Sequence, residues 1–213
     1  MSTLPRAKKE CGSWFWDLDE TAPSGLDSAL SVAARMVEVL DQFELLSPRG
    51  LECMWLALGK GFTGVMSTVF IQSLVDPEIP HKLHGSRPAA LPEAKFRDFK
   101  VIGSGVWYDA EGRPHREPRL VDVSVTTSSY GPTATVSAHH DIWSWFDFSG
   151  RPHPEVQSRN APRLADALLG INSALGVEAE TGEPTYFGHA VEFGISTPDA
   201  DEHGLGPDLT DKL

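Results

Sequence analysis

The sequence is short of positive charge and of long apolar runs, and each shortage excludes a class of function. Its 213 residues carry 18 Lys and Arg against 30 Asp and Glu, for a formal net charge of -12. Nucleic-acid binding and adhesion to anionic membranes both depend on clustered basic side chains, so we expect neither. The most apolar stretch, residues 64–75, contains polar side chains and is too short to span a bilayer.

Cysteine is also scarce. Cys11 and Cys53 are the two present, and their spacing matches neither a zinc site nor a C-x-x-C redox motif. A disulfide between them stays open at this point. The N-terminus is positively charged but has no apolar run behind it, so we expect no signal peptide and a cytoplasmic protein.

The sequence also lacks the catalytic motifs that identify several common enzyme classes. The sequence has no G-x-S-x-G, no H-E-x-x-H and no cysteine nucleophile with a placed base. Residues 59–64 match the G-x-G-x-x-G of dinucleotide-binding turns, but no alternation of strands and helices follows them. We interpret the match as a turn between two buried segments, and we expect no cofactor.

Composition divides the chain into three parts. Residues 1–10 are polar and are expected to be a flexible N-terminus. Residues 11–195 contain the apolar periodicity of a single α+β domain. Residues 196–213 carry five acids against one lysine, together with Gly and Pro, and are expected to be a disordered acidic tail.

The expected fold class is α+β, a small antiparallel β meander packed with helices. Alternation of apolar and polar residues predicts its strands, and apolar stripes at helical spacing predict its helices. Residues 65–75 are ambiguous and favour a buried helix, whereas four prolines in residues 76–95 predict an extended surface loop. The meander strands are expected at 99–108, 119–127 and 133–145, and the clear helices follow the start signal at 24–27 and span about 162–175.

One nine-residue pattern, W-(Y/F)-D-x-x-G-R-P-H, occurs at residues 107–115 and again at 145–153. Both copies are expected where a strand ends. Asp at the start of a turn caps backbone amides, and Gly accepts the left-handed conformation that such a turn requires. The similarity stops at the nine residues, so it indicates one turn used twice and no domain duplication.

Two tryptophans suggest a binding surface. If the alternation of residues 133–142 continues, Trp143 and Trp145 fall on the polar face of the sheet beside His139 and Asp141. A β-bulge could reverse the register, the chain could fold back over that face, or the tryptophans could anchor a partner. The third explanation assigns partner binding to Trp143, Trp145, His139 and Asp141.

An enzyme alternative uses some of the same residues. His139 and Asp141 form an H-x-D, and with His189 they have the composition of a 2-His-1-carboxylate iron site. The set resembles that of iron-dependent oxygenases of the jelly-roll type, but those folds place strands where a helix is expected here. The alternative is a metal-dependent oxygenase or hydrolase, whereas the main hypothesis has no metal.

The organisation of residues 11–195, acidic and tryptophan-bearing with no catalytic set, resembles that of bacterial polymorphic-toxin immunity proteins. The resemblance is one of organisation without a diagnostic motif, so it transfers no site residues. It implies a non-enzymatic cytoplasmic protein that binds and blocks a toxin, here a basic toxin domain. A structural or regulatory domain without such a partner is the third interpretation.

Overall fold

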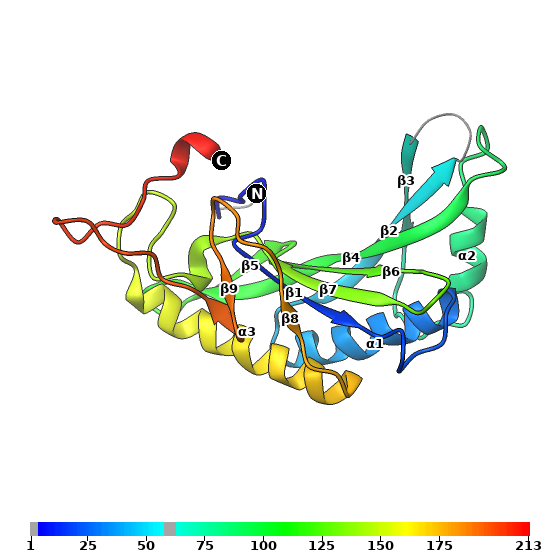
Figure 1. The fold of residues 1–213 in the computed structure, drawn as a ribbon, viewed down its shortest axis with the longest axis horizontal. Coiled ribbons are helices and arrows are strands. Elements are labelled where there is room, and N and C mark those ends of the chain that lie inside the picture. The colour runs from blue at the N-terminus through cyan, green and yellow to red at the C-terminus, as the bar shows by residue number, and fades with distance from the viewer. Residues whose placement is uncertain (1–3, 58–62) are drawn as a thin grey trace.

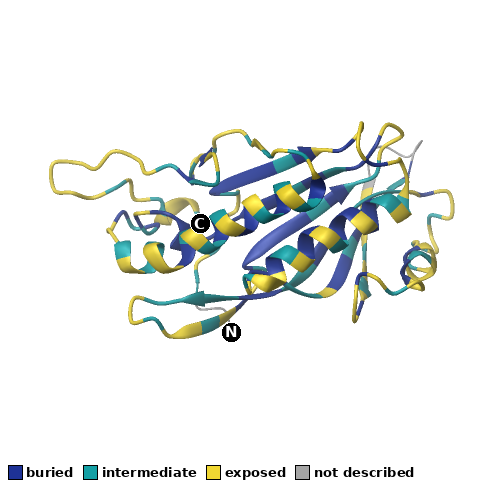
Figure 2. Ribbon diagram, turned by 90° about the horizontal axis from the view of Figure 1, so that it is seen from below, coloured by how far each residue is buried: buried dark blue, intermediate teal, exposed yellow. Residues whose placement is uncertain are grey.

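The fold is α+β and is built on one large antiparallel sheet. A computed structural model describes residues 4–57 and 63–213. Two long helices, α1 and α3, lie side by side across one face of the sheet (Figure 2). The elements in chain order are β1 (Gly12–Asp17), α1 (Leu26–Gln42), β2 (Ser47–Ala57), β3 (Thr63–Phe70), α2 (Ile79–Gly85), β4 (Lys95–Tyr108), β5 (Pro114–Pro118), β6 (Val121–Thr126), β7 (Thr133–Ala138), η1 (Asp141–Trp143), α3 (Pro154–Leu175), β8 (Glu180–Thr181), β9 (Ala190–Val191), β10 (Gly194–Ile195) and η2 (Thr210–Lys212).

The strands follow the order β3-β2-β4-β6-β7-β1-β8, with β5 also paired to β4 (Figure 1). The short strands β9 and β10 form a separate hairpin. In β6, Val121, Val123 and Val125 are buried toward the helices, while Ser124 and Thr126 lie half-buried on the other face. The period-two pattern therefore predicted the centre of the meander correctly, because one face is dry and the other is open.

The core lies between the sheet and the two long helices. The apolar stripes predicted for these helices face the sheet and are buried, including Met36 and Leu40 of α1 and Leu168 and Ile171 of α3. Burying an apolar side chain of this size contributes roughly 1.5–3 kcal/mol. From β1, Trp16 is also buried, and its Nε1 donates to Oδ1 of Asn172 in α3 (2.7 Å).

Both cysteines are free and buried in the core. Burial raises the pKa of the Cys53 thiol to about 12, with the charge of Asp98 acting in the same direction. Burial likewise raises the pKa of Cys11. Because the thiolate is the reactive form, burial makes both cysteines poor nucleophiles, and their side chains pack in the core.

The predicted helix over residues 65–75 is wrong, since residues 65–70 belong to β3, the second strand of the β2–β3 hairpin, and residues 71–75 follow it without helix or strand. Strand β2 buries Leu51, Cys53 and Trp55 on the helix side, but Met54 and Leu56 on the opposite face are apolar too. The sequence of β2 therefore shows no alternation of apolar and polar residues. A short run that is apolar on both faces cannot be assigned to strand or helix by periodicity alone.

Two other predicted boundaries need correction. The loop expected over residues 76–95 contains α2, which has Pro80 near its start and buries Ile79 and Leu83. Helix α3 begins at Pro154, eight residues before its predicted start, and carries Pro162 inside it. Pro162 is exposed, so its ring points away from the core and the helix continues past it.

The two ends of the chain contact the folded domain. In residues 1–10, expected to be flexible, Ala7 is buried and its N–H donates to His139 O (2.8 Å). In residues 196–213, expected to be disordered, Gly206 N donates to Gly150 O (2.8 Å) and Leu209 N to Phe148 O (2.7 Å). Across the described ranges, the helices are all too short or too polar to cross a membrane.

Candidate partner-binding surface

The four residues assigned to partner binding do not form one exposed surface. Strand β7 ends at Ala138 and not at Trp145, so the alternation that placed the tryptophans on the polar face stops before it reaches them. Trp143 lies in the short helix η1 with 1% of its surface exposed, whereas Trp145 is 40% exposed. Trp143 is thus a core residue, and Trp145 is the one of the pair that a partner can reach.

His139 and Asp141 serve the fold in different places. The Asp141 carboxylate accepts a hydrogen bond from Phe148 N (2.9 Å), and burial raises its pKa despite that bond. His139 Nδ1 lies 3.3 Å from Ala7 O, and its Nε2 lies 3.8 Å from Asp122 Oδ2. Burial lowers the pKa of His139, and the nearby charge of Arg6 lowers it further. Because β7 ends at Ala138 and Asp141 begins η1, the H-x-D does not lie on a strand.

The alternative metal set of His139, Asp141 and His189 is not assembled. His139 and Asp141 use their polar atoms as just described, and His189 is exposed in the segment before β9. Within residues 4–57 and 63–213, no three His, Cys, Asp or Glu side chains are grouped so that they could hold a metal ion. The histidines at positions 81 and 84 lie on α2 rather than in a loop, and both are exposed.

Most of the G-x-G-x-x-G match at residues 59–64 lies outside the described residues, and Gly64 is in β3. The elements on its two sides are β2 and β3, which pair with each other as antiparallel strands. A dinucleotide turn needs a strand followed by a helix whose N-terminus meets the phosphates. That context is absent from the described structure on both sides of the match.

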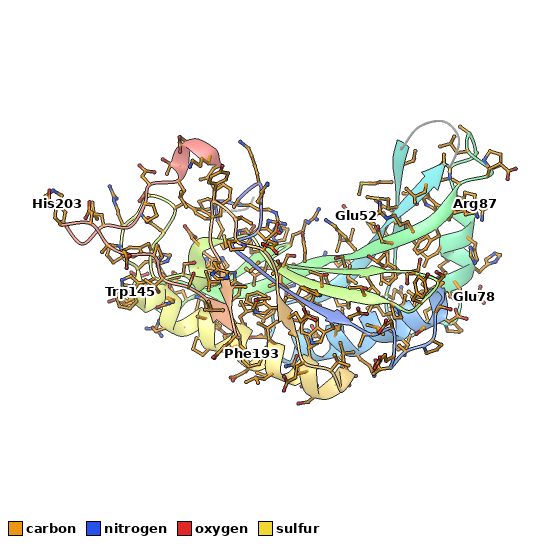
Figure 3. All side chains as sticks on the ribbon, viewed as in Figure 1. Glu52, Glu78, Arg87, Trp145, Phe193 and His203 are labelled. Carbon is orange, nitrogen blue, oxygen red and sulfur yellow. The ribbon has the colours of Figure 1, made fainter. Side chains whose placement is uncertain are left out.

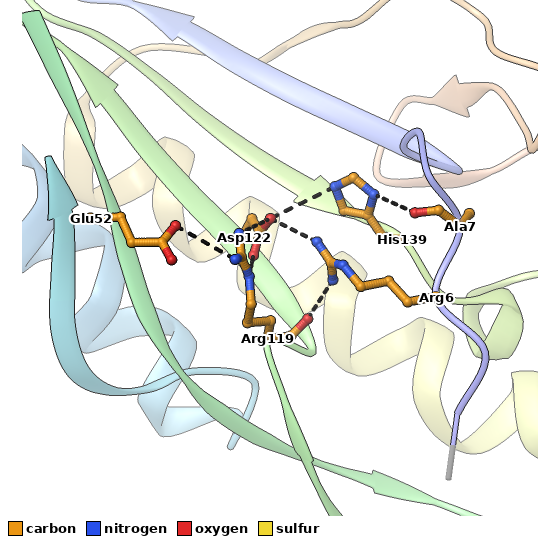
Figure 4. Close-up of polar contacts among 6 residues, drawn as sticks. All are labelled: Arg6, Ala7, Glu52, Arg119, Asp122 and His139. Carbon is orange, nitrogen blue, oxygen red and sulfur yellow. Dashed lines mark hydrogen bonds and ion pairs between the residues drawn. The ribbon is translucent and has the colours of Figure 1, made fainter. Parts of the chain in front are cut away.

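The sheet face away from the helices carries a charged network centred on Asp122 (Figure 4). Arg6 donates to Asp122 Oδ2 (2.8 Å), and Arg119 donates to both carboxylate oxygens (3.2 and 3.1 Å). Arg119 also lies 3.5 Å from Glu52. Although burial opposes the effect, these two arginines lower the pKa of Asp122. Two cations face two carboxylates, so the network is balanced and ties the N-terminal segment to the sheet.

Negative charge is instead concentrated near the C-terminus. Residues 178–211, hereafter the acidic region, contain nine Asp and Glu and no Lys or Arg. All nine side chains are exposed. The segment from about residue 185 onward lies at the end of the molecule opposite the β2–β3 hairpin (orange to red in Figure 1). Lys212 follows the region, with its Nζ 4.7 Å from the centroid of the Tyr186 ring, so a partner approaching this end meets charge that is mainly negative.

Apolar contact points accompany the acids. Beneath the acidic region is a small cavity of about 240 Å³, whose wall includes Phe148 and Phe187, packed edge to face with ring centroids 5.6 Å apart. Tyr186 at its rim is 74% exposed. In the sequence, Trp145 lies between Ser144 and Phe146, which both line the cavity. Figure 3 shows Trp145 at the same end of the molecule as His203. The region thus combines negative charge with exposed aromatic side chains.

From the sequence, concentrated negative charge was assigned to residues 196–213 alone. The stretch of acidic residues without Lys or Arg already begins at Glu178. The signal was present, because residues 178–211 contain no Lys or Arg. What the composition could not supply was exposure, or the position of Trp145 beside this region. The chain matches no family model, and neither the curated proteins nor the solved structures contain a match to it.

Proposed function

We propose that the chain is a non-enzymatic cytoplasmic protein that binds a basic protein partner through its acidic region, as an immunity protein binds and blocks a toxin. The observation that carries the proposal is the run of nine exposed carboxylates without a lysine or arginine among them, beside exposed Trp145 and Tyr186.

The carboxylates are available to a partner. In the described part of the chain, the ion pair that forms within the acidic region joins Glu202 to the exposed His203 (3.6 Å). Charges that are not neutralised internally attract an oppositely charged protein before contact, and this steering raises the association rate. The centre of the open sheet face is less suited to this role, because its arginines and carboxylates are paired with one another.

Aromatic side chains would hold the partner after the encounter. Tryptophan and tyrosine are enriched among the residues whose truncation costs most binding energy, since they bury a large rigid surface with a polar tip. Trp145 is partly exposed already, so a partner can cover the rest of it without unfolding the chain. We expect Trp145→Ala to weaken binding by about 2 kcal/mol, mainly through faster dissociation.

The test compares two triple variants that remove the same charge. One neutralises the acidic region with Glu183→Gln, Glu192→Gln and Asp199→Asn; the control neutralises α1 with Asp27→Asn, Glu38→Gln and Asp41→Asn. All six side chains are exposed. A partner is captured from the native host with the unaltered chain, and its binding kinetics are measured with each variant. We expect the first variant to slow association several-fold at low salt, and the control to change it less.

Equal association rates for the two triple variants would place the interface elsewhere. The immunity role has its own test: the neighbouring gene should encode a large secreted toxin, and co-expression of this chain should protect cells from that toxin's active domain. A neighbouring metabolic cluster and no protection would remove the immunity role and favour an enzyme.

A further inference from the structure

Strand β3 presents an unprotected edge of the main sheet. In the described chain it pairs with β2 on one side and with no strand on the other. Its sequence, T-G-V-M-S-T-V-F, has no charged residue and no proline. Edge strands are usually kept from pairing with other chains by charge, proline, a bulge or short length. The opposite edge of the sheet follows this rule, because β8 spans only Glu180–Thr181 and carries a carboxylate.

The ladder identifies the backbone groups that face outward. Ile71 N donates to Arg49 O (3.1 Å), and the residues of β2 and β3 then pair in sequence from Gly50 with Phe70 onward. In an antiparallel pair, residues that exchange hydrogen bonds alternate with residues that do not. The residues of β3 whose N–H and C=O groups point away from β2 are therefore Gly64, Met66, Thr68 and Phe70.

The side chains of the same four residues lie on the open face of the sheet. Met66 is 56% and Phe70 79% exposed, whereas Val65, Ser67 and Val69 alternate with them and are partly buried. On β2, Met54 lies across from Met66, and its sulfur is 3.7 Å from the position that a Cβ on Gly64 would occupy. The edge thus joins a row of free backbone groups to an apolar patch.

We propose that β3 pairs with β3 of a second copy of this chain, antiparallel and centred on Ser67. In this register Met66 lies opposite Thr68 of the other copy and Phe70 lies opposite Gly64. Every outward-facing residue then meets an outward-facing residue, which is the self-complementarity that a two-fold interface requires. A phenyl ring placed over a glycine on the neighbouring strand also fills the space that the missing side chain leaves.

The distribution of charge favours this edge over others for self-association. Most of the acidic region, from about residue 185 onward, lies at the far end from β3, so these negative segments of the two copies stay apart (Figure 1). Near β3 the chain is richer in cations, including Lys82, Arg87 and Lys95; Figure 3 shows Arg87 at the end opposite Trp145. The net charge of -12 on each copy still opposes association. Salt should therefore strengthen the dimer, whereas it should weaken capture of a basic partner.

The first experiment measures self-association of the purified full chain by analytical ultracentrifugation, at about 0.05 M and about 0.5 M salt. We expect a monomer–dimer equilibrium that shifts toward dimer in the higher salt. Thr68→Lys should weaken self-association by about tenfold or more, since it puts a charge on each side of the two-fold axis. The control, Thr181→Lys, adds the same charge to the exposed edge at β8 and should leave the equilibrium unchanged.

Met66→Pro supplies a second variant in case the lysine disturbs the fold. The Met66 N–H points away from β2, so proline removes a donor to the second copy while keeping the ladder within the chain. Far-ultraviolet circular dichroism should match that of the unaltered chain. We expect this variant to be monomeric as well.

Cross-linking tests the register. The double variant Met66→Cys, Thr68→Cys places thiols on directly opposed residues of the two copies, within reach of a disulfide. It should give a covalent dimer on mild oxidation, whereas Met66→Cys alone should not, because Met66 does not oppose itself. Cross-linking by the single variant would overturn this register.

Two outcomes would overturn the pairing of two copies. One is a dimer that survives both Thr68→Lys and Met66→Pro, which would place the contact elsewhere. The other is a chain that stays monomeric in both salts; if Thr68→Lys then abolished capture of a protein partner, the edge would belong to a foreign strand. Neither result bears on the acidic region, which uses a different surface.

Discussion

The two copies of the nine-residue pattern build the same turn in different surroundings. In the first, Gly112 N donates to Asp109 O (2.9 Å); in the second, Gly150 N donates to Asp147 O (2.9 Å). The glycines have φ angles of 81° and 78°, in the left-handed region. The turn expected from Asp and Gly is therefore confirmed in both copies, because it depends on groups only a few residues apart.

The side chains around the two turns make different contacts. Asp109 accepts hydrogen bonds from Arg113 Nε (2.8 Å) and lies 2.8 Å from Nε2 of His115. Asp147 instead accepts a bond from the Ser149 hydroxyl (2.7 Å). The second histidine, His153, precedes α3 and instead contacts Ser144 O (2.9 Å).

Burial separates the two turns further. A Cβ on Gly112 would meet the flexible end of Arg159, at 3.1 Å, whereas a Cβ on Gly150 would fall on the backbone carbonyl of Gly206. The same sequence thus forms an exposed connection between β4 and β5 in one place and the base on which the C-terminal segment rests in the other. The difference predicts unequal responses to matched changes.

The largest effect is expected for Gly150→Val. It combines a strained left-handed backbone with a clash against the Gly206 carbonyl, which cannot move without releasing the C-terminal segment. We expect a loss of about 3 kcal/mol in the free energy of unfolding. Urea denaturation measures it, and a value near that of the matched change at Gly112 would contradict the packing of the C-terminal segment on this turn.

A smaller loss is expected for Gly112→Val, about 1 kcal/mol. The backbone strain is the same, but the side chain of Arg159 can rotate away. The same urea titration applies, with Ala110→Val on the exposed part of this turn as the control for an added side chain. An unchanged midpoint would show that Gly112 does not need its left-handed conformation.

His153→Ala should cost about 1 kcal/mol, because it leaves the carbonyl of the buried Ser144 without its partner. His115→Ala should cost less, since the His115 side chain is more than a third exposed and its bond to Asp109 competes with water. Thermal unfolding of both variants at one pH compares them. A larger loss for His115→Ala would reverse the order of burial assigned to the two turns.

The smallest effect is the pH dependence of the first turn. Partial burial opposes it, but hydrogen bonds from His115 and Arg113 lower the pKa of Asp109 below its usual value. A carboxylate with a lowered pKa stabilises the folded state above the pKa of the unfolded chain, near 4, and this contribution is lost as the pH falls through the folded value. The stability gap between the unaltered chain and Asp109→Asn should therefore narrow below about pH 4. A difference in stability between the two proteins that is the same at about pH 3 and about pH 6 would contradict a lowered pKa of Asp109.

Sequence patterns predicted the fold class and the elements whose two faces differ. The alternation in β6 and the stripe in α1 were readable because one face is buried and the other is wet. The hairpin of β2 and β3 was not, since apolar side chains lie on both faces of β2. The predicted exposure of Trp143 was wrong for a related reason: the alternation of β7 was extended past Ala138, where the chain turns into η1 and buries Trp143.

What the sequence determined by itself is local or global: the two left-handed turns, the apolar faces of α1 and α3, and a net charge of -12. Turn chemistry and helical periodicity act over a few residues, and net charge needs no fold. Only the tertiary structure decided that Trp143 is covered while Trp145 is open, and that β3 ends the sheet. Those features depend on contacts between segments far apart in the chain, and the composition of one segment does not specify which other segments pack against it.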